Sequence, residues 1–290
     1  MNRLKLLIQL MSFLFFVPFS SLSQEQESAL LWEITGKKVK TPSYLFGTMH
    51  LIPKDDFLFP DHLREKVAST KLLVMEIGGL SEQMQMASLL FLQEGNVFDF
   101  FGKEQKDTLF QYLNDHLEMD STAAKMQFGR MKPMGLMQLF TQSSFGESPE
   151  SYEMTLEQIA KKHDMDIQGL ETVEEQMAIF DGMTMEDQVE MVMVAMRTGD
   201  DNTETRKLID LYLTQDVEAL HAFMHKDEGG LMTYQDELLD NRNERWIPQI
   251  KRFIKKNPTF IAVGAGHLGG ENGVIELLRK EGYTLKPIKL

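Results

Sequence analysis

Two short motifs of the same form, G-x-x-H, each follow an apolar segment. The first spans residues 47–50 and ends in His50, and the second spans residues 264–267 and ends in His267. Glycine lets the backbone turn tightly after a strand and leaves room for a ligand. An imidazole placed there can bind a metal, transfer a proton or polarise a carbonyl. One such histidine would most simply be a buried side chain bonded to a loop carbonyl, but two in matching contexts favour a functional site.

Two glutamates lie where apolar strands are expected to end. Glu76 is near the end of the segment KLLVMEI, and a buried carboxylate there needs a cation, a metal or hydrogen-bond donors. We interpret Glu76 as a metal ligand or general base, ahead of a structural ion pair. Glu171 follows a short predicted strand, and its role stays open between structural and catalytic. Thr172 and Glu175 fit a helix capping box, so Glu175 is predicted to be structural.

Arg242 and Asn243 lie in the predicted helix LLDNRNERW. Arg242 shares a helix face with Trp246, which is four residues further on. Its guanidinium could neutralise Glu76 or bind a substrate carboxylate with two parallel hydrogen bonds. The alternative is a surface ion pair with a nearby acidic residue, the usual and weakly stabilising role of such charges.

The elements that must position these residues follow from the apolar patterning. Strands are expected at residues 30–35, 44–46, 71–77, 166–169, 259–263 and 284–288. Helices are expected between them, at 61–69, 152–163 and 273–281 and through most of 170–256. This order predicts an α/β (α+β) fold with a central mixed β-sheet, built from N- and C-terminal strands, and a large helical insertion. Sites in such folds form at the carboxyl ends of strands.

The helical insertion is expected at about residues 81–165, because apolar residues recur there with helical spacing and few are β-branched. It includes the methionine-rich run KMQFGRMKPMGLMQLF. Methionine of this kind usually fills a core. Lining of a flexible substrate groove is the alternative.

The first residues have the three-part layout of a secretory signal peptide. Basic Arg3 and Lys5 precede an apolar run, and small residues lie just before Gln24. We therefore expect a signal peptide at 1–23 and a mature domain at 24–290 that is exported, periplasmic or secreted, and soluble after leader cleavage. A retained membrane anchor is the alternative, although the apolar run is short for a span.

Composition and missing motifs exclude several functions. The formal net charge of −14 argues against nucleic acid as a partner. There is no cysteine, so a nucleophile must be oxygen, nitrogen or water, and a metal must be held by other side chains. The segment 264–269 matches G-x-G-x-x-G, but the acidic residue expected at the end of the next strand is absent. We interpret that match as unrelated to dinucleotide binding.

Five segments together resemble the TraB/GumN family, and their order and spacing cover about residues 28–290. They are YLFGTMHL, LLVMEI, GLETVEEQ, LLDNRNERW and FIAVGAGHLGGENGVIELLRKEGYTLKPI. The wider group includes the animal Tiki proteins, which look like metal-dependent proteases, and the erythromycin-esterase and haem-binding ChaN-like proteins. Residue by residue, the resemblance places the family's site positions on His50, Glu76, Glu171, Arg242, Asn243 and His267.

The resemblance implies an exported metal-dependent hydrolase that acts on a peptide or protein substrate. Its metal ligands would be His50, Glu76 and His267, holding a divalent ion such as manganese or cobalt, with zinc as a third candidate. Activated water would then supply the nucleophile that the cysteine-free chain lacks. The alternative is a non-catalytic periplasmic protein that sequesters a peptide, haem or metal. No oligomeric state follows from the sequence.

Overall fold

The computed structural model describes residues 28–290 except 38, 144, 147, 202, 226–233 and 235. The signal peptide expected at 1–23 lies outside the described residues. Within the described ranges, no helix combines the length and the apolar composition that a membrane crossing requires.

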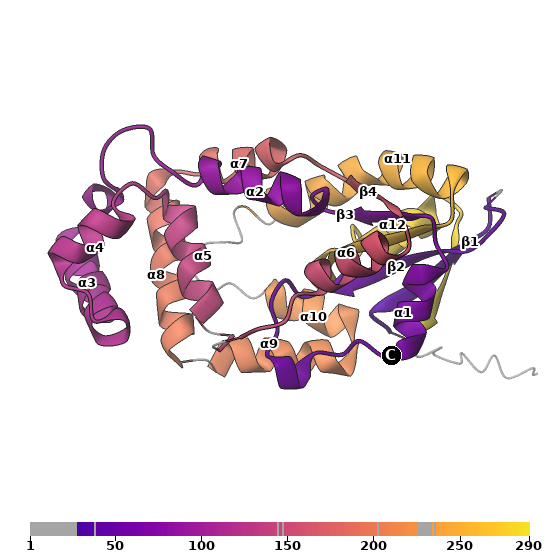
Figure 1. The fold of residues 1–290 in the computed structure, drawn as a ribbon, viewed down its shortest axis with the longest axis horizontal. Helices are drawn as coiled ribbons and strands as arrows, with labels where there is room; N and C mark the ends of the chain where they lie inside the picture. The colour runs from indigo at the N-terminus through magenta and orange to yellow at the C-terminus, as the bar shows by residue number, and fades with distance from the viewer. Residues whose placement is uncertain are drawn as a thin grey trace, which may run out of the picture.

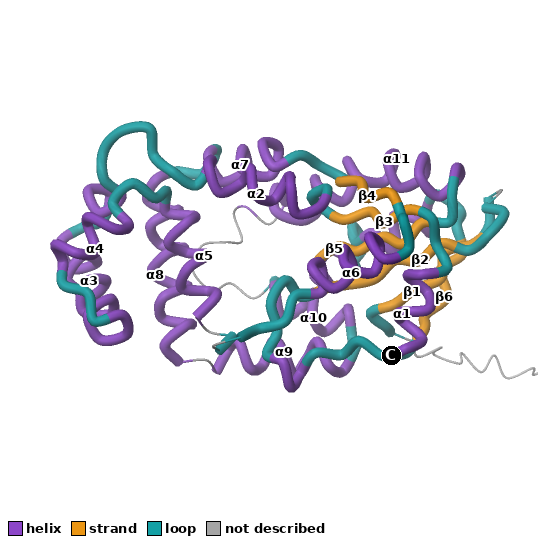
Figure 2. The backbone as a smooth tube through the Cα atoms, in the orientation of Figure 1, coloured by secondary structure: helices purple, strands orange, loops and turns teal. Residues whose placement is uncertain are grey.

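A mixed six-stranded sheet is the centre of the fold (Figures 1 and 2). Its strands are β1 (Leu31–Thr35), β2 (Ser43–Thr48), β3 (Leu72–Met75), β4 (Asp166–Gly169), β5 (Thr259–Gly264) and β6 (Thr284–Ile288). The order is β4-β3-β5-β2-β1-β6, with β4, β3, β5 and β2 parallel and β1 antiparallel to both of its neighbours. The expected α/β fold, with strands from both ends of the chain and helices between them, is confirmed.

The connections between strands diverge at the centre of the sheet. From β3 the chain passes through α6 (Tyr152–Lys162) to β4, whereas from β5 it passes through α12 (Val274–Lys280) to β6 at the opposite edge. Helices α1 (Asp61–Ala68) and α6 cover one face, and α11 (Asn241–Lys256) and α12 cover the other (Figure 1). Because β3 and β5 are neighbours whose connections leave in opposite directions, their carboxyl ends flank the type of crevice in which α/β folds bind ligands.

The remaining helices are α2 (Gly79–Leu89), α3 (Lys103–Leu117), α4 (Ser121–Phe128), α5 (Pro133–Ser143), α7 (Val173–Asp181), α8 (Met185–Asp201), α9 (Thr203–Thr214) and α10 (Val217–Met224). They include a lobe beside the sheet, formed by α3, α4, α5 and α8, and two helices, α9 and α10, that pack into the core of the sheet (Figure 1). Helices α3, α4, α5 and α8 share a hydrophobic core of their own. The predicted bounds of the helical insertion, about residues 81–165, stay a prediction. The core of the lobe also includes α8, which follows residue 165 in the chain.

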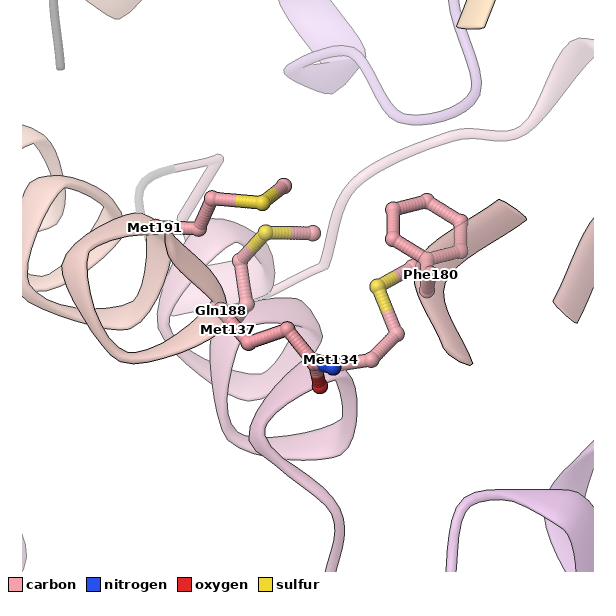
Figure 3. A pocket seen from close by; sticks show the side chains of 5 residues that line it. All are labelled: Met134, Met137, Phe180, Gln188 and Met191. Atoms are coloured by element: carbon pink, nitrogen blue, oxygen red, sulfur yellow. The ribbon is translucent and has the colours of Figure 1, made fainter. Parts of the chain in front are cut away.

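The methionine-rich run contributes to that lobe. Met131 and Met137 pack against its core, whereas Met126 is 81% exposed. A small pocket between α5, α7 and α8 is lined by Met134, Met137, Phe180, Gln188 and Met191 (Figure 3). Core packing, the main interpretation of this run, therefore holds for some of its methionines but not for Met126.

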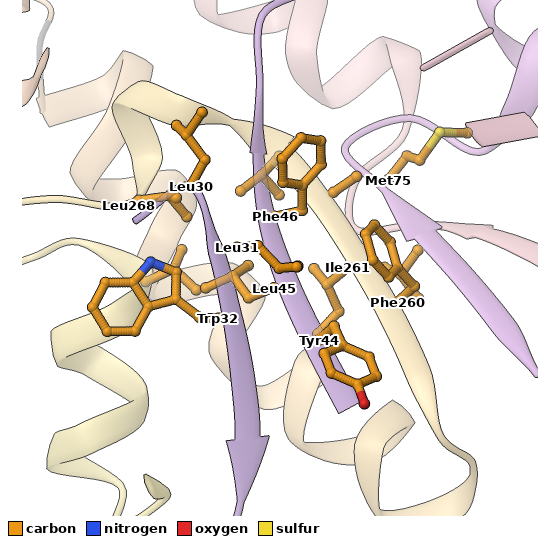
Figure 4. Packing of buried hydrophobic residues seen from close by; sticks show 14 of the residues in the cluster. Leu30, Leu31, Trp32, Tyr44, Leu45, Phe46, Met75, Phe260, Ile261 and Leu268 are labelled. Atoms are coloured by element: carbon orange, nitrogen blue, oxygen red, sulfur yellow. The ribbon is translucent and has the colours of Figure 1, made fainter. Parts of the chain in front are cut away.

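The core of the sheet is aromatic where it supports the site. Phe46 in β2 is completely buried, and its ring lies 5.5 Å from the Tyr152 ring and 6.1 Å from the Phe260 ring, centre to centre. Figure 4 shows Phe46 and Phe260 with the aliphatic side chains of the neighbouring strands. Since Tyr152 begins α6, this packing fixes that helix against the sheet.

Replacing Phe46 with alanine should lower the free energy of unfolding by about 3–5 kcal/mol, because it removes a fully buried ring and leaves a cavity. Urea denaturation measures the change. Met126→Ala, at a highly exposed position of the lobe, should cost less than about 0.5 kcal/mol. Equal losses in the two variants would contradict the buried packing of Phe46.

Candidate functional site

The carboxyl ends of four neighbouring parallel strands bring the polar residues together. Thr48 ends β2, Glu76 follows β3, Glu171 follows β4, and His267 lies in a short 3-10 turn after β5. Glu76, Glu171 and His267 are all buried. The site therefore occupies the crevice that the strand connections define.

The two G-x-x-H loops lie against each other because β2 and β5 are paired in parallel, with Thr48 opposite Gly264. A side chain at Gly47 would place its Cβ 2.7 Å from Leu268 Cδ1 and 3.1 Å from the Cα of Ala265. Such a separation from Leu268 is too short for real carbon contacts. Glycine at position 47 thus permits the second loop to approach the first.

Arg242, from the first turn of α11, lies at the centre of the buried polar cluster. Its Nη2 donates to Glu76 Oε2 at 2.5 Å and to Glu171 Oε1 at 2.6 Å, and its Nε also donates to the Glu171 carboxylate. Its Nη1 donates to the carbonyl oxygen of Leu238 at 2.9 Å and to His267 Nε2 at 3.2 Å. All five N–H groups of the guanidinium thus have partners within the protein.

Arg242 pairs with Glu76, which is one of the alternatives that the sequence left open. The other alternative, a surface ion pair with a nearby acidic residue, is wrong because the side chain is buried. The side chains of Arg242, Glu76 and Glu171 are 7%, 9% and 3% exposed. The guanidinium also lies over the ring of Trp246, 4.8 Å from its centre. Arg242 therefore has no free donor for a substrate carboxylate in this arrangement.

The hydrogen bonds of Asn243 determine which nitrogen of His267 carries the proton. Asn243 Nδ2 donates to the carbonyl oxygen of Asn272 at 2.9 Å, so its Oδ1 faces His267 Nδ1, at 2.7 Å. An amide oxygen only accepts, which requires a proton on Nδ1. Arg242 Nη1, which only donates, faces Nε2 and requires a lone pair there. The contacts with Asn243 and Arg242 thus require the same neutral tautomer of His267, which is protonated on Nδ1 and unprotonated on Nε2.

Arg242 keeps Glu76 ionised, and burial keeps His267 neutral. Burial raises the pKa of Glu76, but Arg242, helped by His267, His50 and the Gly264 N–H, holds it well below its usual range. Burial lowers the pKa of His267 to about 3, opposed by Glu76 and assisted by Arg242 and His50. A carboxylate and a neutral imidazole therefore face each other, with Glu76 Oε1 3.8 Å from His267 Nε2.

His50 lies at the exposed rim of the site, and its side chain is 70% exposed. Its Nδ1 is 3.1 Å from Glu153 Oε1, to which Thr48 Oγ1 also donates at 2.7 Å. The Glu153 carboxylate raises the pKa of His50, and the charges of Glu76 and Arg242 also act on it. His50 thus belongs to the electrostatic surroundings of the cluster without being packed into it.

The structure brings Glu76, Glu171, Arg242, Asn243 and His267 into one connected network and leaves His50 beside it. The capping box of Thr172 and Glu175 is confirmed by hydrogen bonds of 3.1 and 2.8 Å. Further contributors, which were not predicted as site residues, are Thr48, Glu153, Tyr212 and Gly264. An acid in the first turn of a helix is favoured by the helix dipole alone, so the position of Glu153 carries no specific signal in the sequence.

The donor types fit a divalent cation, although only part of the set is preassembled. A neutral imidazole nitrogen and a carboxylate oxygen are ligands that zinc and manganese accept. Glu76 Oε1 and His267 Nε2 lie 3.8 Å apart, and they accept hydrogen bonds from Gly264 N–H and Arg242 Nη1 that an ion would have to replace. Among the described residues, no group of three or more His, Asp or Glu side chains is arranged to hold a metal ion. His50 remains the nearby candidate for a third donor.

Comparisons with known proteins agree with the motifs of the sequence. The model of the TraB/PrgY/gumN family matches residues 30–287. Metalloprotease TIKI2 of Danio rerio is 38% identical over 55 residues, and Metalloprotease TIKI1 of Homo sapiens is 42% identical over 53. These matches cover 18% and 17% of this chain but only 11% and 10% of the relatives' lengths. No solved structure gives a significant match.

The depressed pKa of His267 predicts a loss of stability in acid. Its pKa is about 3 in the folded protein and about 6.5 when unfolded, so the unfolded chain binds the proton more tightly. The contribution of neutral His267 is complete above about pH 6.5 and is lost as the pH falls towards 3, by at most about 1.4 kcal/mol per pH unit. Urea unfolding of the metal-free protein between pH 6.5 and 4.5 measures this slope.

His267→Gln should flatten that slope, while His62→Gln, a change at a half-exposed histidine remote from the cluster, should leave it unchanged. A slope that persists in His267→Gln would show that another group titrates in this range.

Replacing Arg242 with methionine should destabilise the fold by about 3–5 kcal/mol, because two buried carboxylates lose their cation. Arg252→Met is the matched control, since Arg252 lies on the same helix but is exposed. Urea denaturation compares the two, and a similar small loss in both would contradict the central role of Arg242.

Proposed function

We propose that this chain, which belongs to the TraB/PrgY/gumN family, is a metal-dependent hydrolase of peptide bonds. The main support is the geometry of His267. Its Nδ1 proton is bound by Asn243, and its unprotonated Nε2, which accepts from Arg242 Nη1, lies 3.8 Å from Glu76 Oε1. A histidine whose second nitrogen is held by a hydrogen bond is the usual form of a metal-binding imidazole.

Glu76 and His267 would hold the ion, with His50 as the third protein ligand. A manganese, cobalt or zinc ion bound there would supply activation of water for attack on a carbonyl. Arg242 keeps Glu76 ionised and, with Glu171, fixes the direction of its carboxylate. Asn243 keeps Nε2 of His267 free of a proton. The roles of Arg242, Glu171 and Asn243 use contacts that are already present in the folded chain.

A peptide as substrate is supported by the Tiki relatives, whose names describe them as metalloproteases. Those matches cover only short segments of the relatives. Peptide hydrolysis by this chain is therefore a proposal. The sequence of residues 1–23 supports an exported enzyme, working in the periplasm or outside the cell.

One observation favours a second candidate, a protein that binds a ligand without turnover. All five N–H groups of Arg242 are satisfied internally, as in a purely structural ion cluster. Such a protein would bind a peptide, haem or metal through the same histidines. Turnover separates the two candidates, because only the hydrolase releases shortened products.

The test combines metal binding with peptide cleavage by the purified chain 24–290. We expect manganese, cobalt or zinc to bind and to support cleavage of a mixed peptide library, detected by mass spectrometry. His267→Ala and Glu76→Gln should each reduce cleavage by at least about 100-fold, since loss of one ligand weakens both binding of the ion and activation of water.

His62→Ala is the matched control, because His62 is bonded to the carbonyl of Lys289 and lies outside the cluster. It should cleave at the rate of the unchanged protein. Absence of cleavage with all three metals would overturn the hydrolase proposal, and peptide binding without cleavage would establish the second candidate. Undiminished cleavage in both cluster variants would refute this location of the site.

A further inference from the structure

We propose that Glu153 is a positioning residue for His50: it binds Nδ1 of the imidazole and so presents Nε2 to the metal. This inference rests on the proposed function, because that function makes His50 a ligand. It assigns a role to a helix that carries no part of either G-x-x-H motif.

The carboxylate of Glu153 is surrounded by donors from the first motif and its neighbours. Its Oε1 accepts from Thr48 Oγ1 at 2.7 Å and lies 3.1 Å from His50 Nδ1, while its Oε2 accepts from Ser151 Oγ at 3.1 Å. An ionised carboxylate only accepts hydrogen bonds, so the contact with His50 requires a proton on Nδ1. The ring nitrogen left for another partner is Nε2.

The burial of Glu153 distinguishes this contact from an ordinary surface ion pair. Its side chain is only 16% exposed, whereas that of His50 is 70% exposed. Desolvation of a carboxylate costs free energy, and an exposed histidine gains little by being paired. The hydrogen bonds from Thr48 and Ser151, together with the His50 contact, compensate for this burial.

The same arrangement occurs at the second histidine. His267 Nδ1 is bound by Asn243, the third residue of α11, and His50 Nδ1 is bound by Glu153, the second residue of α6. In both cases a side chain in the first turn of a helix holds Nδ1. The two histidines, which follow adjacent strands, are thereby given the same unprotonated nitrogen, Nε2, although that of His267 also accepts from Arg242 Nη1.

The backbone below His50 is also fixed, so that a change at Glu153 acts mainly on the ring. The Tyr212 hydroxyl, on α9 and completely buried, donates to the carbonyl oxygen of Gly47 at 3.0 Å. Burial raises the pKa of this phenol well above its ordinary value, which keeps it a donor. The loop is therefore anchored by Tyr212, while the ring of His50 is oriented by Glu153.

The first test is spectroscopic and needs neither metal nor turnover. In protein labelled with ¹⁵N-histidine, His50 should give a signal at the chemical shift of a protonated Nδ1 and an unprotonated Nε2, assigned with His50→Gln. Glu153→Ala should abolish that signal, whereas Glu157→Ala should retain it. Glu157 lies one turn further along α6 and pairs with Lys161, so it controls for damage to the helix. A signal that survives Glu153→Ala would overturn the inference.

The second test measures the affinity of the chain for zinc and manganese by calorimetry. Glu153→Ala should weaken binding by about 10–100-fold, the usual effect of removing a residue that orients a ligand. Glu157→Ala should have no effect, and Glu153→Gln should restore much of the affinity because its amide oxygen can still accept from Nδ1. This restoration also guards against a variant that merely folds poorly.

The outcomes separate this inference from the proposed function. Unchanged affinity in Glu153→Ala, with tight binding by the unaltered protein, would overturn the role of Glu153 alone. Absence of metal binding by the unaltered protein would overturn the proposed function and, with it, this inference.

Discussion

The structure of the site depends on one buried cation, the guanidinium of Arg242. Two carboxylates at the ends of neighbouring strands, Glu76 and Glu171, could not both remain ionised in a buried cluster without it. Its planar array of five donors satisfies both acids, a helical carbonyl and the imidazole of His267 together. Lysine, a compact point charge with three donors, could not reproduce this pattern. The arginine therefore sets both the charge and the geometry of the cluster.

The fold makes this cluster possible by bringing four parallel strand ends to one edge. The crevice between β3 and β5 arises because the chain leaves these neighbours in opposite directions. Helix α11 then covers the crevice and inserts Arg242 and Asn243 from its first turn. Trp246, completely buried, packs its ring 4.5 Å from the ring of His267, centre to centre. A rigid sheet and one amphipathic helix thus hold the reactive groups, which limits their freedom before any ligand binds.

The two histidines differ in their surroundings although their motifs are alike. His267 is enclosed by α11 and kept neutral, whereas His50 is open to solvent and paired with a carboxylate. The side of the site that contains His267 is therefore preformed, and the side that contains His50 lies on a loop at the rim. The lobe that contains α3, α4, α5 and α8 has its own core, separate from the one that supports the cluster.

The sequence alone determined the sheet class, most strand positions and the identity of the polar residues at the strand ends. These features are local: apolar runs of strand length and glycine before histidine are visible along the chain. Only the tertiary structure decided that Arg242 binds Glu76 and Glu171, and that Glu153 holds His50. The partners in these pairs are separated by 71 to 166 residues. Contacts of that kind depend on strand order and helix placement, for which a single sequence carries no local signal.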